Sequence, residues 1–369
     1  MQKPRNNIFL TGGHGATAAL AVTMEITRRK LPVNLFWIGA KYAIEGKAVK
    51  TLEYESLPAL GVKFLPIFTG RLQRKFTFWT VPSILKTPIG FIQSFWHLVS
   101  FRPKVVLSFG GYSAFPVVLA ANLIGIPVVI HEQTSAAGRA NLASAPLARK
   151  IALSRQESIK YFPKGKTVLT GNPVAPYAFS LKVNTSPSSL PVIFITGGSR
   201  GSRNVNRVVK QALPKLLLKY KVIHQTGELD AHDFEKTKNT LPPELSRNYE
   251  VFSRVEHEKM IKLLGESDLV VARSGANTIS DILAVKRPAI LIPLPISYLD
   301  EQTKNAEYAR SIGVARIIPQ RDLTPEVLVS GIEEAISSYE KMSKNFLRFK
   351  NPDKHAASSL VDIITPYLN

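Results

Sequence analysis

The chain has 369 residues, of which 45% are hydrophobic and 20% are charged, and it contains no cysteine. This length suggests two domains, and the composition excludes a disordered or collagen-like protein. The absence of cysteine excludes disulfides, thiolate nucleophiles and cysteine-ligated zinc. The net charge is +21, and residues 1–185, with 23 Lys and Arg, six Glu and no Asp, carry +17 of it. The first half therefore predicts an anionic partner, such as nucleic acid, an acidic membrane or a phosphorylated substrate.

Short apolar runs, each followed by a glycine turn and a helical stretch, recur from the start of the chain. They occupy residues 8–10, 35–38 and 105–108. The uncharged stretch at residues 105–130 is long enough to cross a bilayer, but its glycines and prolines favour a strand, a turn, a helix and a second strand. Alternating strands and helices predict a parallel sheet covered by helices on both faces.

The alternation restarts after a polar segment, residues 181–190, whose Ser and Pro suit a linker. The later apolar runs are residues 191–196, 222–226, 269–273 and 289–294. We therefore predict an α/β protein with two doubly wound parallel-sheet domains and a cleft between them. Their expected bounds are residues 1–175 and 190–349, with a final helical segment, residues 350–369, that packs on one of the two domains.

Two glycine-rich turns hold equivalent positions directly after the first strand of each domain. They are TGGHG at residues 11–15 and TGGSRGSRN at residues 196–204. Glycine allows close approach of a ligand to the backbone, and the free N–H groups of a helix start favour phosphate. Either turn alone is explained more simply as a tight turn without a ligand. Two of them favour a phosphate-bearing ligand, although neither has the spacing of a Walker or dinucleotide motif.

Two side chains near strand ends are candidate site residues. His14 has the pKa range of a general base and can also donate to phosphate, although a helix cap is an equal alternative. Glu132 follows the apolar run at residues 128–130, where ligands bind in such sheets. Its alternative is a structural pair with a cation such as Arg139.

The segment RSGANTISD at residues 273–281 predicts a strand end, a glycine turn and a helix start. Asp281 has the chemistry to accept the two hydroxyls of a ribose, whereas the alternative is a capped helix start. No Asp-x-Asp pair occurs in the sequence, so a metal held in that way is not expected.

Aromatic, aliphatic and basic residues gather in residues 64–101. Such a segment is typical of a helix that lies in a membrane interface, where each cation near an anionic surface contributes about 1 kcal/mol. A buried core helix with solvated lysines is the alternative for half of these residues.

Seven motifs in this order, TGGH, SFGGYSAFP, IPVVIHEQ, GNPV, TGGSRGS, RSGANTISD and DEQTKNA, span about the whole chain and resemble the MurG family of peptidoglycan glycosyltransferases. The resemblance implies the two-domain GT-B fold, with the last helix crossing back to the N-terminal domain. It implies transfer of N-acetylglucosamine from UDP-GlcNAc to the C4 hydroxyl of undecaprenyl-pyrophosphoryl-MurNAc-pentapeptide, which converts lipid I to lipid II. It also implies a peripheral protein on the cytoplasmic face of the bacterial inner membrane, with an anionic membrane surface as partner and no nucleic acid.

The resemblance implies an inverting displacement without a metal or cofactor, in which His14 is the candidate base and Glu132 is held in reserve. It places residues 1–175 as the acceptor- and membrane-binding domain and residues 190–349 as the UDP-sugar-binding domain. The residues implied to bind UDP-GlcNAc are Thr11, Gly12, Gly13, Thr134, Ala175, Ser199, Val255, Ala276, Asn277, Thr278, Ile279, Ser280, Asp281 and Gln302.

Three of these positions depart from the pattern of the family. Thr134 replaces the usual Asn, Ala175 replaces the usual Arg and Asp281 replaces the usual Glu. An alanine cannot replace a guanidinium, so we hypothesise that Arg200 supplies the charge that is missing at Ala175.

Three alternative functions remain open at this stage. A UDP-sugar 2-epimerase has the same fold and donor site but needs no lipid surface. A glycolipid synthase that acts on diacylglycerol would keep the membrane segment without a site for a muramyl pyrophosphate. A basic nucleic-acid-binding protein fits the charge, but the sequence contains no recognisable reading module.

Overall fold

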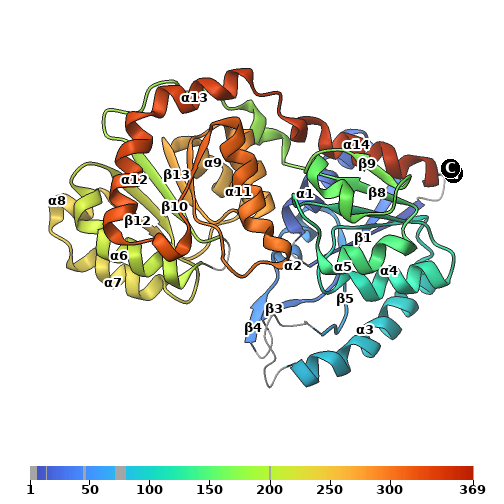
Figure 1. Cartoon of the computed structure of the whole chain (residues 1–369). Coiled ribbons are helices and arrows are strands. Elements are labelled where there is room, and N and C mark those ends of the chain that lie inside the picture. The colour runs from blue at the N-terminus through green and yellow to red at the C-terminus, as the bar shows by residue number, and fades with distance from the viewer. Residues whose placement is uncertain (1–5, 14, 45–46, 71–79, 199–200, 369) are drawn as a thin grey trace. The chain divides into compact units, whose positions relative to one another are not determined.

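The computed structural model describes residues 6–13, 15–44, 47–70, 80–198 and 201–368. The chain forms two compact units, one made of Met1–Ala175 with Pro352–Asn369 and the other of Pro176–Asn351 (Figure 1). Each unit contains one parallel sheet with helices in the strand connections. The predicted α/β fold class is therefore confirmed.

The first unit is built on a seven-stranded sheet in the order β5-β2-β1-β6-β7-β8-β9. Its central strands are buried, as their almost uncharged sequences require. The strands are β1 (Asn6–Thr11), β2 (Val33–Gly39), β5 (Lys63–Pro66), β6 (Val105–Ser108), β7 (Val128–Glu132), β8 (Lys150–Leu153) and β9 (Thr167–Leu169), beside a hairpin of β3 (Tyr42–Ile44) and β4 (Lys47–Lys50). The helices are α1 (Ala16–Arg28), α2 (Leu52–Ser56), α3 (Thr80–Phe101), α4 (Ala114–Leu123), α5 (Arg139–Ser144) and α14 (Ala356–Ile364). The uncharged stretch at residues 105–130 thus forms the predicted strand, turn, helix and strand.

The second unit repeats this plan with a six-stranded sheet in the order β12-β11-β10-β13-β14-β15. Its strands are β10 (Val192–Thr196), β11 (Lys221–Gln225), β12 (Tyr249–Phe252), β13 (Leu269–Ala272), β14 (Ala289–Leu291) and β15 (Ala315–Ile317). Its helices are α6 (Arg203–Leu217), α7 (Ala231–Thr240), α8 (Pro243–Ser246), α9 (His257–Glu266), α10 (Ala276–Val285), α11 (Glu301–Ile312), α12 (Pro325–Ser337) and α13 (Tyr339–Arg348). The central β10 pairs with β11 and β13, so its glycine turn lies between two other strand ends.

The polar segment that suggested a linker packs on the second unit. Lys286 donates to the carbonyl oxygens of Phe179 and Leu181, and Arg287 donates to that of Lys182. The second unit therefore begins at Pro176 rather than after residue 190, because the half-buried Lys286 and the buried Arg287, which follow α10, use these carbonyl oxygens as acceptors.

Helix α3 turns an apolar face outward over the part of it whose side chains are described. Leu98 and Ser94 are fully buried, whereas Trp96 is 69% and Ile92 is 65% exposed. The exposed apolar set, which we call the α3 face, is Ile89, Ile92, Phe95, Trp96 and Val99. Residues 71–79, which carry Arg71, Arg74, Lys75, Phe76, Phe78 and Trp79, lie outside the described residues. No helix in the described ranges is both long and apolar enough to span a bilayer.

The end of the chain belongs to the first unit, where α14 packs against α1 (Figure 1). Arg29 of α1 donates to the Asp362 carboxylate and to Ser358 of α14. Because α14 buries Leu360, Val361 and Ile364 in the core of this unit, residues 352–368 complete the N-terminal domain.

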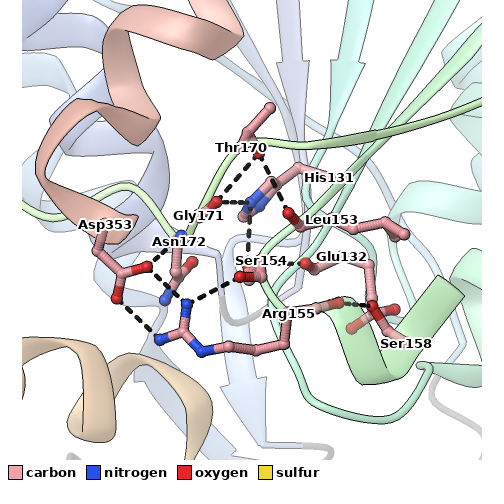
Figure 2. A network of polar contacts seen from close by, with 10 residues as sticks. All are labelled: His131, Glu132, Leu153, Ser154, Arg155, Ser158, Thr170, Gly171, Asn172 and Asp353. Atoms are coloured by element: carbon pink, nitrogen blue, oxygen red, sulfur yellow. Dashed lines mark hydrogen bonds and ion pairs between the residues drawn. The ribbon is translucent and has the colours of Figure 1, made fainter. Parts of the chain in front are cut away.

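A buried ion pair anchors this terminal segment (Figure 2). The two terminal guanidinium nitrogens of Arg155 donate to the carboxylate of Asp353, at 2.6 and 2.8 Å, and the two side chains are 5% and 0% exposed. The Asn172 amide donates to the same carboxylate at 2.8 Å. Gly171 has a φ of +82°, and a Cβ there would lie 2.4 Å from the Pro352 carbonyl oxygen, so only glycine allows this approach.

Substitution of Asp353 by Ala will destabilise the first unit by about 3–5 kcal/mol, because it removes the carboxylate that pairs with the buried charge of Arg155. All three tryptophans, Trp37, Trp79 and Trp96, belong to this unit, so tryptophan fluorescence during urea unfolding reports its stability selectively. Asp362→Ala is the matched control, because its carboxylate is 64% exposed and its pair should contribute less than about 1 kcal/mol. Equal losses for the two variants would contradict the anchoring role of Asp353.

Candidate functional site

The site residues predicted from the sequence fall into one group in each unit. In the first unit, β1 ends at Thr11, whose buried hydroxyl donates to the Ile38 carbonyl oxygen at 2.8 Å. The Gly13 amide donates to Gly110, and Gly12 accepts from the Ser113 hydroxyl, at 2.8 and 2.7 Å. The TGGHG turn therefore packs directly on the FGGYS turn that follows β6.

This contact between the two turns explains several of their glycines. Gly111 has a φ of +87°, and a Cβ there would lie 2.3 Å from the Gly13 carbonyl oxygen. A Cβ on Gly15 would lie 2.6 Å from that of Phe109. Packing is thus a sufficient reason for these glycines, and contact of Gly12 and Gly13 with a ligand stays a prediction. His14 lies outside the described residues.

Glu132 is held by the loop that follows it (Figure 2 shows its side chain). Its Oε1 accepts from the amide and the hydroxyl of Thr134, both at 3.0 Å. Its Oε2 accepts from the Gly138 amide at 2.8 Å and from Asn141 at 2.9 Å. With two donors on each oxygen and 2% exposure, this carboxylate has the contacts of a group that shapes the loop at residues 133–141.

Other residues near Glu132 also have well-defined environments. The hydroxyl of Thr134 is used on Glu132, and Ala175 is fully buried, so neither presents a free polar group to a ligand. Burial lowers the pKa of His131 to about 4, partly offset by its bond to the Gly171 carbonyl, so this imidazole is neutral near pH 7.

In the second unit, the glycine turn after β10 is bound to the adjacent strand ends. The Thr196 hydroxyl donates to Gln225 at 2.7 Å and accepts from the Gly198 amide at 2.9 Å. A Cβ on Gly201 would lie 1.9 Å from the Thr226 carbonyl oxygen, whereas one on Gly198 would meet no atom of the described residues within 4 Å. Gly198 therefore borders open space, as a ligand-binding turn requires. Ser199 and Arg200 lie outside the described residues.

The second predicted helix start is α10, which follows β13. Its first turn, Ala276 to Thr278, is half-exposed and Gly275 supplies no side-chain cap, so its amides can donate to an anion. Ile279 and Ser280 are buried in the unit, and Val255 is 8% exposed. The carboxylate of Asp281 faces His257, with 3.4 Å between Oδ2 and Nε2.

Gln302 lies next to this helix start. Its Oε1 accepts from the Leu294 amide at 3.0 Å, which orients the amide group, and its carbonyl oxygen accepts from the Ser274 hydroxyl. Asn305 donates to the Ser274 carbonyl oxygen at 3.1 Å. The RSGAN and DEQTKNA motifs are therefore brought together by hydrogen bonds.

Arg273, the first residue of RSGAN, was not predicted as a functional residue. Its guanidinium donates to Ser202 at 2.8 Å, to Gln320, and to the carbonyl oxygens of Ile292 and Pro293. These acceptors are neutral, and burial lowers the pKa of Arg273 to about 10, so the group remains cationic near pH 7. A buried positive charge thus lies directly behind the glycine turn, and only its position beside GGSRGS in space reveals it.

Among the described residues, no three His, Cys, Asp or Glu side chains are grouped so that they could hold a metal ion. The groups described around these two turns are backbone amides, amide side chains, the buried Arg273 guanidinium and the Asp281 carboxylate. These groups suit a phosphorylated, hydroxyl-rich ligand.

Two family models match the chain, one to its N-terminal part and one to its C-terminal part. Residues 11–153 match the glycosyltransferase family 28 N-terminal domain, and residues 192–361 match the glycosyltransferase family 28 C-terminal domain. Together these matches cover most of the chain.

Similar proteins agree with this assignment. A Treponema denticola protein named UDP-N-acetylglucosamine–N-acetylmuramyl-(pentapeptide) pyrophosphoryl-undecaprenol N-acetylglucosamine transferase is 33% identical over 90% of this chain and 89% of its own length. A Bacillus subtilis protein of the same name is 32% identical over 96% of both chains. The crystal structure of Acinetobacter baumannii MurG has a TM-score of 0.69 at 25% identity and covers 98% of this chain and 99% of its own.

A UDP-GlcNAc 2-epimerase from Neisseria meningitidis, solved with UDP-GlcNAc, has a TM-score of 0.63 over 98% of this chain and 100% of its own. Its 14% identity shows a shared fold alone. The ordered motifs, the two sheets and the identity over nearly the full length lead to one assignment: the chain belongs to glycosyltransferase family 28, within the MurG family of N-acetylglucosamine transferases.

Proposed function

We propose that this protein transfers N-acetylglucosamine from UDP-GlcNAc to the C4 hydroxyl of undecaprenyl-pyrophosphoryl-MurNAc-pentapeptide. The observation that carries the proposal is the 33% identity, over 90% of the chain, to a transferase whose name states that donor and acceptor. The two turns at strand ends and the cationic Arg273 support it, because they suit a donor that leaves as a nucleoside diphosphate.

The reaction is a single inverting displacement. A base takes the proton of the C4 hydroxyl, the oxygen attacks the anomeric carbon of the donor sugar, and the bond from that carbon to the diphosphate oxygen breaks. His14 is the proposed base. Amides of the glycine turn after β10 and of the α10 start stabilise the negative charge on departing UDP, with Ser199 as a further contact.

The buried guanidinium of Arg273 adds to this stabilisation. Its charge has only neutral acceptors among the contacts described for it, and it bonds Ser202 at the start of α6. A cation in such a water-poor position acts on a nearby diphosphate more strongly than a solvated one does. Arg273 is therefore a second candidate, besides Arg200, to supply the positive charge of the arginine that Ala175 replaces.

The remaining donor contacts follow from the same proposal. Thr11, Gly12, Gly13 and Gln302 serve the sugar and diphosphate, Val255 approaches the uracil, and Asp281 accepts the ribose hydroxyls. We propose that Glu132 acts on the acceptor side through the loop it organises, because all of its described donors belong to that loop.

We further propose that the α3 face docks on an anionic membrane surface at the cytoplasmic side of the bacterial inner membrane. Trp96 and Ile92 expose apolar area that a bilayer interface would bury. Lys63 lies 5.2 Å from the centre of the Phe101 ring, and Arg102 and Lys104 follow the end of the helix, which provides cations for acidic headgroups. The net +17 of the first half of the chain supports the same partner.

The direct test is transfer of radiolabelled sugar from UDP-GlcNAc to lipid I by the purified protein. We expect a β-linked lipid II and stoichiometric UDP. Formation of UDP-N-acetylmannosamine without an acceptor would instead identify an epimerase and contradict the proposal.

His14→Ala should lower kcat by about 10²- to 10⁴-fold, which is the usual contribution of a general base. The affinity for UDP measured by calorimetry should stay near that of the unchanged protein, because the acceptor proton plays no part in donor binding. Glu132→Gln is the comparison, because it keeps the shape of the side chain. In this variant, the limb of the pH–rate profile that reports the base should keep its apparent pKa. A His14→Ala protein with an unchanged kcat would remove His14 from the mechanism.

Trp96→Glu should weaken binding to vesicles of phosphatidylglycerol and phosphatidylcholine by at least about tenfold. The substitution replaces an indole that the bilayer interface would bury with a carboxylate that the anionic headgroups repel. Co-sedimentation at fixed ionic strength measures the effect. Leu218→Glu is the matched control, since Leu218 is 72% exposed in the second unit. A similar loss in both variants would assign the binding to total charge rather than to the α3 face.

A further inference from the structure

Three side chains from separate elements of the second unit form a chain of polar contacts that ends at Asp281. Tyr177 belongs to the 3₁₀ turn Pro176–Ser180, His257 is the first residue of α9, and Asp281 lies in the second turn of α10. The Tyr177 hydroxyl is 3.0 Å from Nδ1 of His257, and Nε2 of the same ring is 3.4 Å from Oδ2 of Asp281. The His257 and Asp281 side chains are 11% and 10% exposed.

This order of contacts suits one tautomer of the imidazole. A tyrosine hydroxyl that donates to Nδ1 leaves the proton of neutral histidine on Nε2, and Nε2–H then points at the carboxylate. Burial raises the pKa of Tyr177, and the carboxylates of Asp281 and Glu258 raise it further, so the hydroxyl keeps its proton. Burial lowers the pKa of His257, but the Asp281 carboxylate more than offsets this, and the net shift is upward.

Few other ionisable groups surround the ring. Glu256 and Glu258 flank His257 on its own helix, Asp281 faces it from α10, and Tyr177 faces it from the 3₁₀ turn. Helix α9 also packs on β10, whose residues Val192–Thr196 carry no ionisable side chain. Asp281 is therefore the carboxylate with which Nε2 interacts.

We propose that His257 is a positioning residue that holds Oδ2 of Asp281, so that Oδ1 accepts the ribose hydroxyls of the donor, and that Tyr177 holds His257 in the tautomer this requires. The inference rests on the proposed function, in which Asp281 binds the ribose. The 3.4 Å contact is longer than an ideal hydrogen bond, and such contacts tighten when a ligand draws the carboxylate into place. A positioning partner is useful here because aspartate is one methylene shorter than the glutamate usual in the family.

The ribose contact is isolated by comparing UDP with 2′,3′-dideoxy-UDP, which lacks both hydroxyls. The ratio of their dissociation constants, measured by calorimetry, reports the contribution of the carboxylate to affinity. The contributions of the diphosphate and the uracil cancel, because both ligands carry these groups. Hydrogen bonds to a charged group predict a ratio of about 10 to 100 for the unchanged protein.

His257→Leu should lower this ratio by about tenfold while the affinity for 2′,3′-dideoxy-UDP stays constant, which also shows that the variant is folded. His257→Gln should restore most of the ratio, because its amide places an N–H near the position of Nε2. His232→Gln on α7 is the control, since His232 is exposed and should leave the ratio unchanged.

Tyr177→Phe gives a readout that a merely structural role would not produce. Below the pKa of His257 both ring nitrogens carry protons and Nε2–H still faces Asp281, so the ratio should be normal at about pH 6. Above that pKa the neutral ring is free to place its proton on Nδ1, so the ratio should fall as the pH rises, whereas the unchanged protein should keep its ratio on both sides of the pKa.

The outcomes separate the inference from the proposed function. A protein that binds UDP and prefers it to the dideoxy analogue, but whose preference survives His257→Leu, overturns the inference and leaves the function standing. A protein that binds both ligands equally overturns the assignment of Asp281 to the ribose, and with it the inference. A protein that binds neither ligand overturns both.

Discussion

The parallel alignment of the strands is the constraint on which the rest of this structure depends. Because neighbouring strands point the same way, their carboxyl ends meet at one edge of each sheet, and the turns that follow must fit beside one another. In the first unit this brings Gly13 within hydrogen-bond distance of Gly110. In the second unit it brings Gly201 against Thr226. The glycines that mark the motifs are thus required by strand packing before any ligand is considered.

The sequence predicts the fold class well because buried parallel strands are short, apolar and followed by turns. The eight apolar runs singled out in the sequence all become strands, and the interrupted stretch at residues 105–130 folds as its glycines and prolines indicate. The strands that were missed are mostly short or lie toward the edges of the sheets, such as β9 and β15, whose sequences are too brief or too polar to stand out. The segment at residues 181–190 looked like a linker because its own sequence is polar, and only the carbonyl acceptors it offers to Lys286 and Arg287 explain its place.

The candidate site is harder to predict, since its decisive contacts join residues far apart in the chain. The tautomer of His257 depends on Tyr177, 80 residues earlier, and no local pattern connects the two. In the sequence, Glu132 and Asp281 are both carboxylates that follow an apolar run, directly in the first case and within the next helix in the second. The structure separates them by their partners: four loop donors surround Glu132, whereas Asp281 faces a single imidazole. The role of a carboxylate here follows from how many donors it already satisfies.

The ion pair of Arg155 and Asp353 joins residues separated by 198 positions, and this separation matters during synthesis. At about 5–20 residues per second, the ribosome needs roughly 10–40 s to proceed from the arginine to its partner. During that interval the N-terminal sheet lacks α14 and its buried arginine lacks a counter-ion, while the whole second unit is made and can fold as a continuous stretch. The first unit is therefore completed after the second, and its native core becomes possible only when residues 352–368 have left the ribosome.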